Sequence, residues 1–261
     1  MCRRLVNGDG SLLEAGRLVC HCLLIETPRD GLVLVDTGLG QHTLDNHKTL
    51  GRFFLGAARP ALRPEETALH QLQALGYTRN DVRHIVLTHL DLDHAGGIAD
   101  FPEAEVHVYA PEHRAAMQPD FRSRARYVAA QWAHGPRWSL HDHAGDDWFG
   151  LAGLTPLPGV AEDILLVPLI GHTRGHAGVA VRGERGWLLH CGDAYFYRDQ
   201  VAAQPHSTPG LSVFEKLAQT LPRERMQNLA RLQQLAGEKA DSVQLFCAHD
   251  PVEFAQLAAQ P

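Results

Sequence analysis

The fold prediction rests on one stretch of the chain, Thr88-His89-Leu90-Asp91-Leu92-Asp93-His94-Ala95-Gly96-Gly97. Within six positions it places two histidines and two aspartates, all able to bind a metal ion. The apolar, β-branched run that leads into it predicts a buried strand over residues 84–88. Gly96 and Gly97 then allow the chain to turn sharply. A solvated turn is the alternative, but a dense His/Asp cluster at the end of a rigid strand favours a metal site.

Composition limits the classes of protein to consider. The 261 residues are 44% hydrophobic, enough to bury a substantial core in one large domain or two small ones. The net charge of −6 provides no basic surface of the kind that binds nucleic acid. We therefore expect a globular protein without a nucleic-acid partner.

Compartment is inferred from what the sequence lacks. The N-terminus, residues 1–8, has no long apolar segment typical of a signal peptide. No apolar run reaches the roughly 20 residues of a membrane-spanning helix. The odd number of cysteines, five, favours reduced thiols. We expect a cytoplasmic protein without a membrane partner.

Hydrophobic periodicity predicts alternating strands and helices. Strands are expected at residues 18–26, 32–35, 84–88, 105–109, 164–170, 179–181, 187–191 and 243–247. Helices are expected at residues 65–75, 98–101, 111–117, 122–132, 222–236 and 251–257, the last capped by Asp250. The order suggests two similar halves, each a sheet covered by helices on one side.

Polar clusters recur where these strands end, at Asp36, residues 89–94, His172, Asp193 and His249. Strands that end at the same edge of a sheet present their loops together. Side chains far apart in the sequence can therefore converge. Asp36, which precedes Thr-Gly, is expected to organise its loop and to support the metal ligands from behind.

The motifs at these positions resemble those of the metallo-β-lactamase superfamily. They are His89-x-Asp91-x-Asp93-His94, Gly171-His172-Thr173-x-Gly175-His176, Gly192-Asp193 and Ala248-His249-Asp250. The resemblance implies one α/β domain over residues 1–261, folded as a four-layer αββα sandwich with a metal site at one edge of the two sheets. Asp36-Thr37-Gly38 and Gly192-Asp193-Ala194-Tyr195 are similar to the branch that includes acyl-homoserine lactonases.

The resemblance also implies a set of metal ligands for two divalent ions. One ion would be held by His89, Asp91 and His172, the other by Asp93, His94 and His249, with Asp193 bridging them. His176, although part of its motif, would be structural.

Position 91 departs from the family pattern, which normally has a second histidine there. Flavodiiron oxygen reductases of the same superfamily also have a carboxylate, although the flavodoxin domain that accompanies them is missing here. With Asp91 as a ligand, the residues, two divalent ions and one hydroxide sum to zero charge, against +1 for the usual set. Zinc remains the first expectation, but the hard oxygen donor makes manganese or iron more competitive. Asp91 could also fall short of the metal.

The expected reaction is hydrolysis of an ester or lactone such as an acyl-homoserine lactone. Two metal ions would generate a bridging hydroxide nucleophile and polarise the carbonyl group. Asp93 would orient the nucleophile and pass its proton to the leaving alkoxide. Tyr195 would donate a hydrogen bond to the oxyanion, unless it is simply a packed aromatic residue.

Other activities share this scaffold. A secreted β-lactamase would need an export signal, and a nuclease would be expected to carry a basic surface. A thioester hydrolase of the glyoxalase II type and an iron-dependent enzyme of oxygen or sulfur chemistry remain alternatives. A non-catalytic binding module is disfavoured by the complete ligand set.

Substrate choice is expected to lie in three variable segments that form a pocket or lid, residues 39–64, 111–160 and 197–215. Tryptophans 132, 138 and 148 would line an apolar pocket or simply belong to the core. The run His141-Asp142-His143 is interpreted as a polar loop, with a second metal site as the less favoured alternative. The apolar residues 53–55 could pair in a homodimer.

Overall fold

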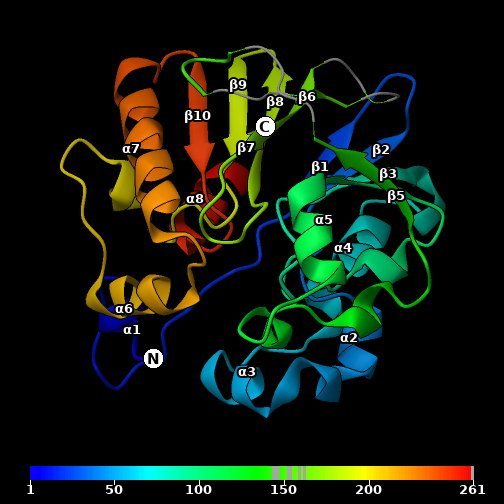
Figure 1. The fold of residues 1–261 in the computed structure, drawn as a ribbon, viewed down its shortest axis with the longest axis horizontal. Helices are drawn as coiled ribbons and strands as arrows, with labels where there is room; N and C mark the ends of the chain where they lie inside the picture. Colours follow the sequence, from blue (N-terminus) through cyan, green and yellow to red (C-terminus); the bar gives the residue numbers. More distant parts are fainter. Residues whose placement is uncertain (143–146, 152–154, 158–159, 161–162, 260–261) are drawn as a thin grey trace. The chain divides into compact units, whose positions relative to one another are not determined.

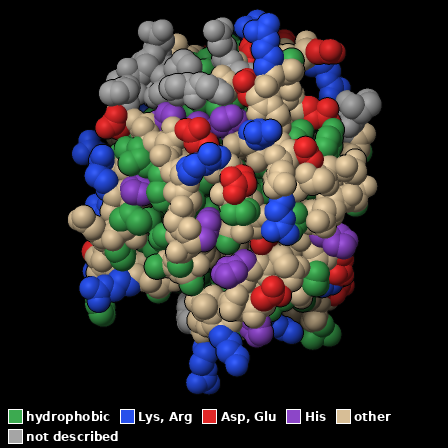
Figure 2. Space-filling view, turned by 90° about the vertical axis from the view of Figure 1, so that its right-hand side faces the viewer, with side chains coloured by type: hydrophobic (Ala, Val, Ile, Leu, Met, Phe, Trp, Pro, Cys, Tyr) green, Lys and Arg blue, Asp and Glu red, His purple; other side chains and the backbone are tan. Residues whose placement is uncertain are grey.

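The computed structural model describes residues 1–142, 147–151, 155–157, 160 and 163–259 (Figure 1). The chain divides into two compact units. Unit 1 comprises Met1–His21, His143–Pro156 and Glu162–Pro261, and unit 2 comprises Cys22–Asp142 and Leu157–Ala161. None of the described helices combines the length and the apolar character that a membrane span requires. On the face drawn in Figure 2, positive and negative side chains are interspersed.

Unit 2 is built on a five-stranded sheet in the order β1-β2-β3-β4-β5. Its strands are β1 (Leu23–Glu26), β2 (Leu32–Val35), β3 (Val82–Val86), β4 (Glu105–Tyr109) and β5 (Arg137–His141). Only β1 is antiparallel to its neighbour, whereas β2 to β5 run parallel to one another. The carboxyl ends of β2 and β3 therefore meet at one edge, where Asp36 and residues 88–97 follow them.

The helices of unit 2 are α2 (Gln41–Asp45), α3 (Gly51–Ala57), α4 (Ala68–Ala74) and α5 (Ala110–Met117). Short 3₁₀ helices cover His47–Leu50, Pro64–Glu66, Arg79–Asp81, Ile98–Asp100, Ser123–Ala125 and Ala129–Trp132. Leu69 and Leu72 of α4 join Ile85, Val106 and Val108 of the sheet in one hydrophobic cluster. This cluster lies on one face of the sheet, because alternate residues of a strand point to opposite faces.

Unit 1 contains the second five-stranded sheet, in the order β10-β9-β8-β7-β6. Its strands are β6 (Thr155–Pro156), β7 (Ile164–Pro168), β8 (Ala177–Gly183), β9 (Gly186–His190) and β10 (Val243–Phe246). β8 is antiparallel to both β7 and β9, and β10 is parallel to β9. β7, β9 and β10 therefore run in one direction, and the loops that follow them leave from the same edge.

The helices of unit 1 are α1 (Arg3–Val6), α6 (Pro209–Ala218), α7 (Pro222–Glu238) and α8 (Pro251–Ala258), with a 3₁₀ helix at Arg198–Val201 (Figure 1). Leu229, Leu232 and Leu235 of α7 pack into a cluster with β-strand residues such as Leu189. The predicted cap of α8 is confirmed, since the Asp250 carboxylate accepts hydrogen bonds from the amides of Val252 and Glu253.

Several element predictions were wrong. The expected strand 18–26 divides between the units: β1 begins at Leu23, whereas the amide of His21 donates to the carbonyl of Ala248 in unit 1. Residues 122–132 contain two 3₁₀ turns instead of a helix. β5 was missed because an edge strand with two exposed positions lacks the apolar alternation of a half-buried one. α6 was also missed.

The variable segments are only partly irregular. Trp132 is buried in the hydrophobic cluster of unit 2, and Trp138 packs against it. Trp148 is buried in the cluster of unit 1. The structure therefore favours the core interpretation of these tryptophans over the pocket interpretation. His141 ends β5, and His143 lies outside the described residues.

Candidate metal centre

In unit 2 the four predicted ligands lie on the loop that follows β3. His89 and His94 are buried, and their ring centroids are 4.0 Å apart. The Nε2 atom of His89 lies 3.5 Å from Oδ2 of Asp91. Asp93 keeps 23% of its side chain exposed. The loop thus gathers two imidazoles and two carboxylates, as the sequence predicts.

Asp36 holds this loop from the end of the neighbouring strand β2. Its carboxylate accepts hydrogen bonds from the amide and the hydroxyl group of Thr88, both at 2.8 Å, and from Nδ1 of His94, also at 2.8 Å. The residue has a positive φ of 54°, which aspartate tolerates better than most residues. Asp36 thus holds the loop and the His94 ring in place, and its role behind a metal ion stays a prediction.

Other side chains fix the same loop, and the sequence did not reveal them. The Glu112 carboxylate accepts from the amide of Leu90 at 3.0 Å. The amide group of Gln131 donates to the carbonyl of Leu92 at 2.8 Å. Both side chains are buried. Neither belongs to a motif, because their distance from the loop along the chain carries no recognisable spacing.

Arg126 is a further residue that sequence reasoning missed. Its Nε lies 3.2 Å from Oδ1 of Asp91, and the two side chains are only 16% and 12% exposed. The pair is neutral overall, as an uncharged histidine would be. If Arg126 is counted together with the predicted ligand set, the charge sum is +1, the same as for the usual set.

In unit 1, the loops after β7, β9 and β10 bring together His172, Asp193 and His249. Oδ2 of Asp193 lies 3.3 Å from Nε2 of His172, and Oδ1 lies 3.1 Å from Nε2 of His249. All three side chains are buried. One carboxylate thus faces two imidazoles, one with each oxygen, which is the arrangement that a bridging ligand needs.

His176 lies behind this group. Its Nδ1 lies 2.9 Å from the carbonyl oxygen of Leu169, and its Nε2 accepts the amide of Asp193 at 2.8 Å. Both ring nitrogens are thus used to fix the loops that carry His172 and Asp193. The structural role of His176 stays a prediction, and these two contacts are what it would consist of.

The contacts of Nδ1 in His89, His94 and His249 suit a metal site. Nδ1 faces an acceptor in His89 (Thr88 Oγ1, 2.9 Å), His94 (Asp36) and His249 (Val19 carbonyl, 2.6 Å). An Nδ1–H that donates to such a partner leaves the lone pair on Nε2, the pattern seen behind metal-bound histidines. Each Nε2 then points toward a carboxylate oxygen, at 3.1 Å in the case of His249 and Asp193. Two acceptors that face each other favour a cation, so the donor set suits a divalent ion such as zinc.

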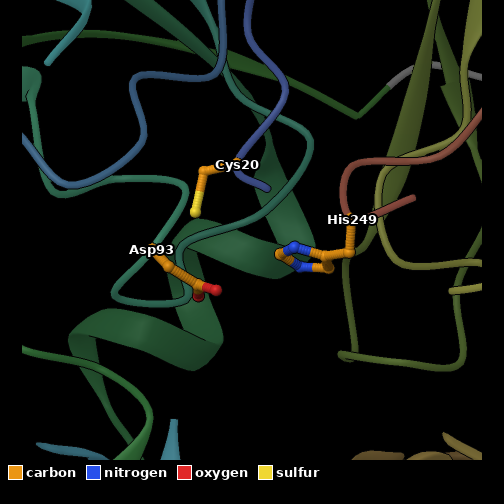
Figure 3. A group of neighbouring side chains, drawn as sticks. All are labelled: Cys20, Asp93 and His249. Carbon is orange, nitrogen blue, oxygen red and sulfur yellow. The ribbon is translucent and has the colours of Figure 1, made fainter. Parts of the chain in front are cut away.

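Figure 3 draws one candidate donor outside the predicted set, Cys20, together with the predicted ligands Asp93 and His249. Within unit 1, Sγ of Cys20 lies within 4.8 Å of a ring nitrogen of His249. The predicted ligand set contains no thiol. Cys20 is thus an additional soft donor beside a predicted ligand.

The oxyanion role predicted for Tyr195 does not agree with the structure. The residue is fully buried, and its hydroxyl group donates to Oε1 of Glu253 at 3.0 Å. The next residue, Phe196, packs against two predicted ligands instead: its ring stacks on His249 with the ring centroids 5.2 Å apart, and its centroid lies 5.8 Å from that of His172. An aromatic residue does adjoin the ligands, but it has no hydroxyl group.

Comparison with known sequences identifies related proteins. The profile of the family described as "Metallo-beta-lactamase superfamily" matches residues 15–243. A probable metallo-hydrolase of Mycobacterium tuberculosis is 46% identical over 243 residues, which cover 92% of this chain and 77% of the relative. An N-acyl homoserine lactonase of Bacillus thuringiensis is 33% identical over 194 residues, which cover 72% of this chain and 70% of the relative.

Solved structures resemble the chain as well. An N-acyl homoserine lactone hydrolase, solved with the product N-hexanoyl-L-homoserine at its catalytic metal centre, gives a TM-score of 0.69 at 21% identity. The match covers 98% of this chain and 91% of that one. A probable metal-dependent hydrolase of Staphylococcus aureus gives a TM-score of 0.68 at 17% identity, over 95% and 84% of the two chains. At these identities the likeness establishes the fold alone.

Proposed function

Because the chain belongs to the metallo-beta-lactamase superfamily and is a metallo-hydrolase, we propose that it opens an ester or lactone ring, with acyl-homoserine lactones as the first substrate class to test. The observation that carries this proposal is that an oxygen atom lies within 2.6–2.9 Å of Nδ1 in His89, His94 and His249, an arrangement that suits Nε2 as the atom that binds the metal. The lactonase relative at 33% identity supports the substrate class.

We propose that two divalent ions, zinc in the first place, are bound by the predicted set. Its members are His89, Asp91, Asp93, His94, His172, Asp193 and His249. Ions held by such a set act as Lewis acids that activate water and polarise a carbonyl oxygen. Manganese and iron remain alternatives, although the Arg126–Asp91 pair weakens the charge argument for them.

Four side chains have further roles in this proposal: proton transfer, support of the loop and exclusion of water. Asp93 is half-buried and has the most accessible side chain of the predicted ligands, so its carboxylate can accept a proton and pass it to a leaving alkoxide. Asp36 and Glu112 hold the loop backbone, and Asp36 also holds the His94 ring, so the donor atoms need no reorganisation when a substrate arrives. The Phe196 ring excludes water beside His249.

Proton release from N-hexanoyl-homoserine lactone tests this proposal. Protein stripped with a chelator and reloaded with zinc or manganese should turn over the lactone. Asp93→Asn, reloaded at a metal concentration high enough to fill both sites, should still lose most of the turnover, because the amide cannot carry the proton. Asp241→Asn, which changes an exposed aspartate, is the matched control and should behave like the parent protein.

Absence of lactone turnover in fully loaded protein would overturn the lactone assignment. Thioesters of the glyoxalase II type would then be the next substrates, followed by redox turnover with iron. Full turnover of Asp93→Asn with metal bound would refute only the proton-transfer role of Asp93.

A further inference from the structure

A second group of histidines lies on the sheet of unit 2, outside the ligand set described above. We call it the strand cluster: His84 of β3, Glu105 and His107 of β4, and His141 of β5. Glu105 is the register partner of His84, and His107 is two positions farther along the same strand. His141 pairs with Tyr109, again two positions on. Because alternate residues share a face, all four side chains lie on one face of the sheet.

Contacts within the strand cluster are close. Nδ1 of His84 lies 3.0 Å from Nε2 of His107, and Nδ1 of His107 lies 3.0 Å from Nε2 of His141. Donor atoms of His84, Glu105 and His107 all lie within 4.8 Å of one another. His107 and His141 are buried, whereas His84 and Glu105 are half-buried and give access from solvent.

We propose that His84, Glu105 and His107 form a separate binding site for a divalent transition-metal ion, with His141 as its supporting residue. Two histidines and one glutamate are a donor set that zinc uses when it keeps a fourth position for water. The face is opposite to the one that carries Val106 and Val108 in the hydrophobic cluster, so the site does not disrupt the core.

The hydrogen-bond chain prepares His107 for this role. If its Nδ1–H donates to Nε2 of His141, the lone pair on Nε2 of His107 is directed at His84. His141 then fixes the tautomer and the ring orientation of His107, as a hydrogen-bond acceptor behind a metal-bound histidine usually does. A metal ion would replace the hydrogen bond between His84 and His107, and the ring proton of His84 would move to its Nε2.

The distances need little change. Two nitrogens bound tetrahedrally to zinc at about 2.0–2.1 Å lie about 3.3 Å apart. The present separation of 3.0 Å between the His84 and His107 nitrogens would widen by roughly 0.3 Å, which a side-chain rotation supplies.

Charge and protonation also agree with metal binding. Burial lowers the pKa of His107 to about 3 and lowers the pKa of His84 and His141, so protons do not compete for their lone pairs at neutral pH. The Glu105 carboxylate forms no ion pair with any residue in the described part of the chain. A divalent ion would neutralise it.

Metal content measured at buffered free zinc tests the site independently of lactone hydrolysis. Chelator-stripped protein is equilibrated with about micromolar free Zn²⁺, separated from unbound metal and analysed by mass spectrometry. His84→Ala and Glu105→Gln should each retain one zinc ion fewer per chain than the parent protein. His70→Ala, which removes an exposed histidine of the same unit, should retain the parent content.

A second measurement separates the supporting role of His141 from a purely structural one. His141→Ala should weaken zinc binding at the strand cluster by about 10–100-fold, since support of this kind typically contributes that much. Its circular dichroism should match the parent spectrum. Equal zinc content in the parent, His84→Ala and Glu105→Gln would overturn the proposal, as would occupancy of the cluster only at millimolar zinc.

Discussion

Asp91 and Arg126 show how a pair of residues can replace a single one. The superfamily usually places a neutral imidazole where this chain has the Asp91 carboxylate, whose Oδ1 lies 3.2 Å from Nε of Arg126. Both side chains are largely removed from water, so each charge depends on the other. The pair has no net charge, like the usual imidazole, so we expect the effects of substituting Asp91 and Arg126 to depend on each other.

This coupling gives a stability prediction. In protein from which a chelator has removed the metal, Arg126→Met should lower the free energy of unfolding by about 1–3 kcal/mol. The reason is that the buried Asp91 carboxylate loses the Arg126 guanidinium group beside it. Asp91→His combined with Arg126→Met should recover most of the loss, since the double variant restores a neutral ring. Urea unfolding measures both, with the exposed Arg124→Met as control. The coupling would be contradicted if the change in the free energy of unfolding of the double variant equalled the sum of the changes in the two single variants.

Asp36 allows a second prediction at the scale of the residue. Asp36→Asn should weaken metal binding about 10–100-fold, because the amide no longer holds His94 Nδ1 with a full negative charge. Asparagine tolerates the positive φ of this position, so a change in backbone strain should not contribute to the measured change in metal affinity. Competition with a zinc chelator gives the affinity, and Asp241→Asn is the control. Unchanged affinity would show that Asp36 only supports the loop.

The loop after β3 depends on close backbone approaches to the segment after β2. A Cβ atom on Gly97 would lie 2.7 Å from the Thr37 carbonyl oxygen, and a Cβ on Gly40 would lie 2.2 Å from Gly97 Cα. The hydroxyl group of Thr37 also joins the loops, accepting from the amide of Gly97 and donating to the carbonyl of His94. Glycine at these positions lets two strand-end loops pack together and thereby sets the positions of the ligands.

Two glycine substitutions test this packing. Gly97→Ala should destabilise the protein by about 1–3 kcal/mol and reduce metal affinity, because Thr37 backbone must move. Gly56→Ala, in α3 with nothing within 4 Å of the added Cβ, should be neutral or stabilise by up to about 1 kcal/mol. Thermal unfolding of the two variants in parallel gives the comparison. Similar effects from both would show that the close approach is not required.

At the scale of the whole molecule, buried titratable groups govern the response to pH. Burial lowers the pKa of His21 in unit 1 and of His107 in unit 2 to about 3. Burial raises the pKa of Glu253 to about 7. Each lowered histidine pKa contributes stability above pH 6.5 that is lost as the pH falls toward 3. The raised pKa of Glu253 acts in the opposite direction, because its contribution is lost as the pH rises from about 4.5 to 7.

The stability that His21 and His107 together lose on going from pH 7 to pH 5 should exceed the stability that Glu253 gains. The metal-free protein should therefore be less stable at pH 5 than at pH 7. Each histidine contributes about 2 kcal/mol over this interval. His21→Leu, which removes one titrating group, should reduce the difference by about that amount. His70→Leu should leave it unchanged. Urea unfolding at the two pH values measures the difference, and an equal difference in parent and His21→Leu would exclude His21 as a source.

The sequence by itself determined the superfamily, the strands that precede the predicted metal ligands, and the helix cap at Asp250. These features depend on local signals: apolar runs, glycine turns and the spacing of His and Asp within motifs such as residues 89–94. Each signal lies within a few residues of the element it predicts. The sequence also indicated Asp36 and His176, because both stand inside such motifs.

Only the tertiary structure revealed that Arg126, Glu112 and Gln131 contact the loop after β3, residues 88–97. It also showed that the Tyr195 hydroxyl group donates to Glu253, which argues against Tyr195 as an oxyanion donor. The structure also shows that His84, His107 and His141 contact one another, although they lie on three different strands and share no sequence motif. Neighbouring strands bring such residues together through register, and register is set by the packing of the whole sheet. A contact that depends on the register of distant segments leaves no local pattern in the sequence.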